Sequence, residues 1–111
     1  MPDFLRKIIE QAHVEDDTCV CLIPKGIKTT NEVIEYLTIG LRFPDYYSRN
    51  WNALDDSLDD LPWLQEKNIL IIHEEFPKIP EKQLNYYIDT LRTASDFWKQ
   101  DGRKTFTVVF L

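Results

Sequence analysis

Glycine and cysteine are scarce in this 111-residue sequence, which holds three glycines and two cysteines. The glycines are scattered, so there is no glycine-rich loop of the kind that cradles phosphates. No apolar run approaches the roughly 18 residues of a membrane span. The N-terminal stretch MPDFLRKIIEQ is amphipathic and lacks the apolar core and cleavage site of a signal peptide. We therefore expect a cytoplasmic protein.

The two cysteines, Cys19 and Cys21, are separated by one residue within an apolar run. On a strand their side chains point to the same face and are poorly placed to bridge each other. The simplest interpretation is a pair of buried, reduced thiols. His13 and His73 are not spaced to complete a metal site with them. We expect no metal and no cofactor.

Basic residues are also fewer than acidic ones. Nineteen acidic residues face thirteen lysines and arginines, for a net charge of −6. Nucleic-acid phosphates would be repelled, so a basic protein is the more reasonable partner. The hydrophobic fraction of 43% and aromatic fraction of 13% indicate a folded globule. A chain of this length forms one domain, and we expect it to be monomeric when free.

The hydrophobic pattern predicts helices and strands in alternation. The expected elements are helix 3–12, strand 18–23, helix 29–41, an acidic helix from about residue 50, strand 68–73, helix 80–100 and strand 106–111. Thr29 and Glu32 form a capping box, Pro80 suits a first helical turn, and Gly102 suits a helix stop.

Strands that are apolar on both faces and separated by helices indicate an α/β fold. We expect a three-stranded parallel sheet with flanking helices. Residues 18–111 would form the core, and residues 1–17 an N-terminal helical extension. We expect the extension to cover an otherwise open surface of the small sheet.

The most informative segment is 45–60, DYYSRNWNALDDSLDD, where five aspartates accompany one arginine. On a helix at about 100° per residue, one side carries the carboxylates of Asp55, Asp56, Asp59 and Asp60. The opposite side carries Ala53, Leu54, Ser57, Leu58 and Leu61. One face can therefore enter a core while the other presents a patch of negative charge.

This acidic patch lowers the stability of the helix that carries it. Its like-charge pairs at i,i+3 and i,i+4 each destabilise a helix by roughly a few tenths of a kcal/mol. Asp59 and Asp60 also lie near a helix C-terminus, where the dipole prefers cations. Solubility alone is a weak reason for such an arrangement, and the pattern favours a surface kept for a positively charged partner. A solvated face remains the alternative.

Aromatic residues surround the acidic segment. We expect Tyr47, Trp51 and Trp63 mostly in the core, and Tyr46 exposed. A tyrosine beside a carboxylate patch is typical of interface hot spots, because it gives contact area at small entropic cost.

Other chemistry is weakly indicated. His73 follows an apolar strand and precedes Glu74 and Glu75, so it could act as an acid or base, although a satisfied strand-end histidine is the simpler interpretation. The aspartates could bind a divalent cation, but a single regular helix does not converge its carboxylates on one point. We expect no enzymatic activity.

The segment FPDYYSRNWNALDDSLDDL (43–61) resembles the barstar family, the intracellular inhibitors of barnase-type ribonucleases. The family pattern combines Pro, an acid, Tyr-Tyr, Asn and a helix with Asp-Ala-Leu-x-Asp. The similarity extends over about residues 18–111, through IKTTNEVIEYL, NILIIH and the final TFTVVFL. It implies a helix and preceding loop that plug a ribonuclease active site, with carboxylates in place of substrate phosphates.

Carried over by position, the resemblance matches Tyr46 to the family's contact tyrosine. Asn50 matches its helix-start asparagine, and Asp56 its central aspartate. Two positions depart from the pattern: Asn52 stands where the family often has Asp, and Asp55 where some members have Trp. These departures favour a nuclease other than barnase itself.

The expected function is therefore inhibition of a basic ribonuclease or nuclease toxin, as an inhibitor or immunity protein. The expected contact residues are Tyr46, Asn50, Asn52, Asp55, Asp56, Asp59 and Asp60. Three alternatives stay open: immunity against a nuclease of unrelated fold, a non-inhibitory domain that regulates another basic protein, and a small enzyme built on His73 and Glu74.

Overall fold

A computed structural model of the chain describes residues 17–44 and 51–111. The expected N-terminal helix lies outside these residues. The described elements are β1 (Thr18–Ile23), α2 (Thr30–Gly40), α3 (Trp51–Leu58), β2 (Asn68–His73), α4 (Glu81–Asp101) and β3 (Thr105–Phe110). For all of them except α3, the bounds differ from those expected by at most one residue at each end.

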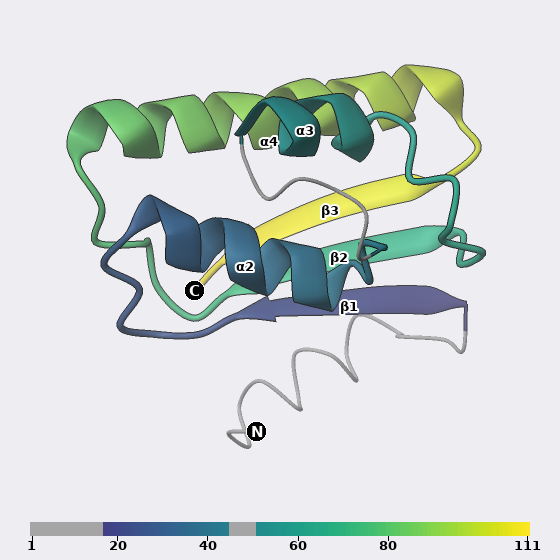
Figure 1. Cartoon of the computed structure of the whole chain (residues 1–111). Coiled ribbons are helices and arrows are strands. Elements are labelled where there is room, and N and C mark those ends of the chain that lie inside the picture. The colour runs from purple at the N-terminus through teal and green to yellow at the C-terminus, as the bar shows by residue number, and fades with distance from the viewer. Residues whose placement is uncertain (1–16, 45–50) are drawn as a thin grey trace.

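The three strands form one parallel sheet in the order β1-β2-β3. In the central register, Cys21 of β1 pairs with Ile71 of β2, which pairs with Val108 of β3. Both crossovers step to the next strand in the same direction, so crossovers of one hand place their helices on one face. Figure 1 shows α2, α3 and α4 together on that face. The expected α/β fold with a three-stranded parallel sheet is confirmed.

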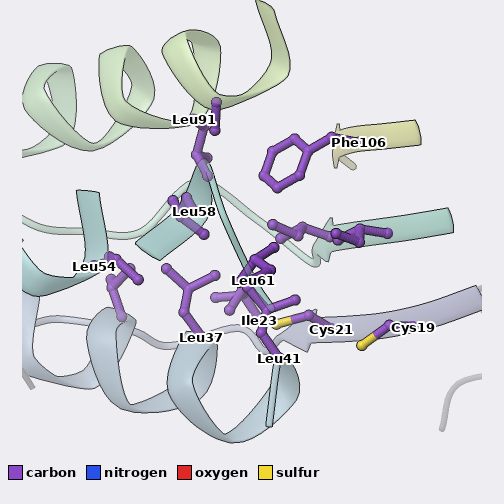
Figure 2. Close-up of a cluster of buried hydrophobic side chains, with 14 of the residues drawn as sticks. Cys19, Cys21, Ile23, Leu37, Leu41, Leu54, Leu58, Leu61, Leu91 and Phe106 are labelled. Carbon is purple, nitrogen blue, oxygen red and sulfur yellow. The ribbon is translucent and has the colours of Figure 1, made fainter. Parts of the chain in front are cut away.

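The main core lies between the sheet and these three helices (Figure 2). Leu37 comes from α2 and Leu41 from its C-cap, two further leucines come from α3 and one from the turn that follows α3, and they meet side chains of β1, β3 and α4. The labelled members are Cys19, Cys21, Ile23, Leu37, Leu41, Leu54, Leu58, Leu61, Leu91 and Phe106. The core therefore holds α3 by one side and leaves its other side to face outward.

The central strand β2 is apolar on both faces, as expected for a strand between two parallel neighbours. Ile69 and Ile71 face the helices, whereas Leu70 and Ile72 are buried on the opposite face. There Val20, Leu22 and Val109 of the flanking strands pack against them.

Local sequence signals account for the start of α2 and for both ends of α4. The Thr29 Oγ1 accepts the Glu32 N–H at 3.2 Å, while the Glu32 carboxylate accepts the Lys28 N–H at 3.3 Å. The capping box thus closes one residue earlier than expected. Pro80 precedes α4, and Gly102 ends it with a φ of 80°. No helix within 17–44 and 51–111 is both long and apolar enough to cross a membrane.

Helix α2 lies close to β1 at Gly40, next to the two cysteines. The Cys19 thiol donates to the Gly40 carbonyl at 3.4 Å, and the Cys21 thiol to the Tyr36 carbonyl at 3.6 Å. Both cysteines are buried and free, as expected. Burial raises the pKa of Cys21 to about 12, so its thiol is protonated and unreactive.

Replacing Gly40 with alanine is expected to destabilise the protein, although alanine ordinarily favours a helix by about 1 kcal/mol over glycine. A Cβ at this position would lie 2.9 Å from the Cys21 Cβ and 3.1 Å from its Cα, and closer still to the Cys21 sulfur. The expected loss is about 1–3 kcal/mol, typical of overpacking. Urea unfolding measures it; Cys21→Ala added to Gly40→Ala should recover part of the loss. A Gly40→Ala variant as stable as the wild type would contradict this packing.

Candidate partner-binding site

The buried side of α3 fixes its orientation on the domain. Leu54 and Leu58 are 1% and 0% exposed, and Ser57 is buried between them. Leu61, in the turn after the helix, is also fully buried. The side predicted to enter the core does so, and the partly buried Ala53 flanks it.

The opposite side carries the four expected carboxylates. Asp56 and Asp60 are exposed, whereas Asp55 and Asp59 are half-buried. Burial raises the pKa of Asp59, and the charges of Asp55 and Asp56 raise it further. These carboxylates are therefore close enough to repel one another. A cationic partner placed over them would relieve that repulsion.

The four aspartates do not lie on one regular helix, which corrects the sequence-based expectation. Helix α3 ends at Leu58, and the N–H groups of Asp60 and Leu61 both donate to the Ser57 carbonyl at 3.0 Å. Leu61 takes a φ of 44°, which returns its side chain to the core. Asp55 and Asp56 thus come from the helix, and Asp59 and Asp60 from the turn that follows it.

A tryptophan from α4 supports this early helix end. The indole N–H of Trp98 donates to the Leu58 carbonyl at 2.7 Å, in a fully buried contact. The carbonyl is one of those that a helix C-terminus leaves without a partner inside the helix. Trp98 therefore fixes the end of α3, and with it the turn that carries Asp59 and Asp60.

Replacing Trp98 with phenylalanine is expected to lower the free energy of unfolding by about 2 kcal/mol, because the buried Leu58 carbonyl loses its donor. Affinity for the partner should fall as well, since the acidic turn loses its anchor. Chemical denaturation measures the first effect and partner titration the second. A matched Phe97→Leu change removes ring contacts on the same turn without touching the hydrogen bond. If it perturbed partner affinity as much as Trp98→Phe, the anchoring role would be wrong.

Three expected contact residues lie outside the acidic turn, at or before the start of α3. Tyr46 and Asn50 lie outside the described residues, as does Tyr47. Asn52 lies in the first turn of α3, where only its backbone is described. Their contact roles remain predictions from the resemblance.

The aromatic surroundings of α3 include one residue that the sequence did not single out. Trp51 is half-buried, with its ring 5.6 Å from that of Tyr86 and 5.8 Å from that of Tyr87. Tyr87 is fully buried, whereas Tyr86 is 44% exposed. Helical periodicity already places Tyr86 off the buried stripe of α4, but only the fold brings it beside the start of α3. Trp63 is half-buried, and its indole donates to the Leu41 carbonyl at 2.8 Å.

A cation borders the acidic surface at its C-terminal end, which the sequence also did not indicate. Arg103 pairs with Asp101 at 2.6 Å and lies 5.6 Å from the Trp98 ring centre. The hydrogen bond to Asp101 is the main cause that raises the pKa of Arg103, and Asp60 adds to it. A hollow of about 360 Å³ lies between Asp60 and Arg103. Arg103 thus partly offsets the charge of Asp60.

His73 is fully buried rather than placed at a reactive surface. Its Nδ1 lies 3.1 Å from the Val109 carbonyl, which can only accept, so Nδ1 carries the hydrogen. Its Nε2, 2.6 Å from the Tyr87 hydroxyl, then accepts from that hydroxyl. The ring also stacks on Phe110 at 4.0 Å. The interpretation of His73 as a satisfied strand-end residue is confirmed.

Metal-binding chemistry finds little support in the described part of the chain. There, no group of three or more histidine, cysteine, aspartate or glutamate side chains is arranged to hold a metal ion. The carboxylates of α3 and its turn spread along a surface instead of converging. A protein partner that presents several cations at once suits this geometry better than a single ion.

The fold is thus a small α/β domain that presents an acidic helix and turn outward from a parallel sheet. A family model described as barstar, the barnase inhibitor, matches residues 18–110. The chain therefore belongs to the barstar family, as the resemblance implied. Searches of the curated proteins and of the solved structures found no match.

Proposed function

We propose that this protein inhibits a basic ribonuclease by covering its active site with α3 and the turn that follows. The observation that supports the proposal is that Asp55, Asp56, Asp59 and Asp60 lie together on the outer surface of α3 and its turn. The opposite side of this segment is buried in the core. Family membership supports a barnase-type ribonuclease as the partner. The inhibitor would act in the cytoplasm of the cell that makes the nuclease.

The aspartates divide by exposure into two roles. Asp56 is exposed within α3 and is the proposed central anchor for the cations of the nuclease site. Asp55, Asp59 and Asp60 would contact the rim and steer the approach. Steering of this kind is a known property of the family's ribonuclease complexes, so it is expected here by that membership.

Aromatic and amide side chains would complete the surface. Tyr46, Asn50 and Asn52 keep the contact roles that the resemblance implies. Tyr86 extends the surface onto α4, because its exposed ring lies against Trp51 at the first residue of α3. Large aromatic side chains beside charged anchors are typical of the residues that dominate binding energy.

The ionic-strength dependence of association tests the proposal. Stopped-flow mixing with purified barnase-type ribonucleases, including any small basic nuclease encoded beside this gene, should give an association rate that falls steeply with added salt. Asp55→Asn with Asp59→Asn should flatten that dependence. The control is Asp89→Asn, which removes one exposed carboxylate charge from α4, outside the acidic surface. An association rate indifferent to salt, or equally altered by the control, would contradict steering by the acidic surface.

A further inference from the structure

Strand β3 presents a free outer edge within the described part of the chain. It is the last strand of the order β1-β2-β3, and its sequence TFTVVF holds neither charge nor proline. The Thr105 N–H donates to the Lys67 carbonyl, and the Leu111 N–H to the His73 carbonyl. Because donors alternate along a strand, the N–H groups of Phe106, Val108 and Phe110 point outward. Such an edge is a template for another strand.

Above this edge, α4 leaves two hollows in a row. One, of about 240 Å³, is floored by Val108 and Phe110 and rimmed by Arg92 and Asp96. The other, of about 350 Å³, lies over Phe106. Ser95 borders both, so the hollows follow one another along β3. A strand added at the edge would direct alternate side chains into them.

The outer side of α4 carries a regular stripe of exposed charges. Asp89, Arg92, Asp96 and Lys99 are spaced by three, four and three residues, and all four are exposed. At about 100° per residue they fall within roughly 80° of one another. Read along the helix, their signs are minus, plus, minus, plus.

The charges of this stripe are complementary to those of the same stripe in a second, antiparallel copy of α4. A two-fold axis through the level of Ala94 places Arg92 opposite Asp96 of a second copy, and Asp89 opposite Lys99. Ala94 neighbours Ser95, which lies between the hollows at the middle of β3. The charges of α4 and the edge of β3 are therefore compatible with one axis. Two-fold symmetry is the commonest arrangement of identical chains.

We propose that a second copy of this chain binds along β3, in antiparallel pairing, to give a continuous six-stranded sheet. The contact differs from the monomer expected from the sequence, and it does not depend on the proposed inhibition. Tyr86, Tyr87 and Trp98 contact α3 from other sides of α4. Both acidic surfaces therefore stay open in the dimer.

Charge reversal on the stripe tests the contact. Sedimentation velocity of the full chain, from about 10 µM to about 1 mM, should show the wild type shifting toward twice its mass. Arg92→Glu or Asp96→Arg alone should weaken dimerisation at least about tenfold, because each sets like charges opposite each other. The double variant restores opposite signs and should return to within about threefold of the wild type. Circular dichroism checks that each variant folds.

Amide hydrogen exchange separates strand pairing from a contact through α4 alone. At high concentration the outward N–H groups of Phe106, Val108 and Phe110 should exchange more slowly than at low concentration. A wild type that stays monomeric throughout, a double variant that fails to recover, or outward amides indifferent to concentration would each overturn the proposal.

Discussion

Replacing Asp56 with alanine is expected to weaken binding to the target ribonuclease by about 30-fold or more. That corresponds to roughly 2 kcal/mol, the general threshold for an interface hot spot. The physical reason is that the cations of the nuclease site would be buried in the complex without their carboxylate. Isothermal titration with the purified nuclease measures the loss, and it should appear mainly as faster dissociation.

The same substitution should leave the inhibitor itself at least as stable as before. Alanine favours a helix more than aspartate does, and removing Asp56 lowers the repulsion that raises the pKa of Asp59. Loss of affinity with unchanged or increased stability would separate recognition from folding. Asp89→Ala, which removes one exposed carboxylate from α4, should leave affinity within about threefold of wild type. If both variants bound equally well, Asp56 would not be the anchor.

Acidification is expected to unfold this protein earlier than its carboxylates alone would require, because of His73. Burial lowers the pKa of His73 from 6.5 to about 4. Between these values the unfolded chain binds a proton that the native chain does not. Stability is therefore complete above about pH 6.5 and falls as the pH drops, by about 3 kcal/mol when pH 4 is reached.

Urea unfolding at a series of pH values measures this dependence. A His73→Gln variant lacks the titrating ring, so its stability should change less between pH 6.5 and pH 4 than that of the wild type. It should also be less stable at pH 7, because the stack on Phe110 is lost. Parallel curves for the two proteins would show that His73 is not held neutral by the fold.

Local sequence signals were sufficient to predict most of the fold. The strand bounds follow from short apolar runs, the start of α2 from Thr29, and the ends of α4 from Pro80 and Gly102. What the sequence could not predict depends on contacts between distant segments. The end of α3 at Leu58 is stabilised by Trp98, 40 residues further on. The close approach at Gly40 depends on Cys21 of another element.

The candidate site shows the same division. Helical geometry alone assigned Leu54 and Leu58 to the core and the aspartates to the outer side, because both follow from the angle between residues. The unequal exposure of Asp55 and Asp56, the position of Arg103 beside Asp60, and the exposed ring of Tyr86 all depend on packing. Helical periodicity indicates that Tyr86 is exposed, but not that its ring lies beside α3.

Titration of ribonuclease activity tests the central claim most directly. Increasing amounts of this protein are added to a purified barnase-type ribonuclease, and RNA cleavage is followed with and without a competing nucleotide. If the acidic surface occupies the active site, cleavage should fall to zero at one inhibitor per enzyme, and the nucleotide should slow binding. A complex that forms while cleavage continues, or that forms equally well with the nucleotide bound, would contradict occupation of the site.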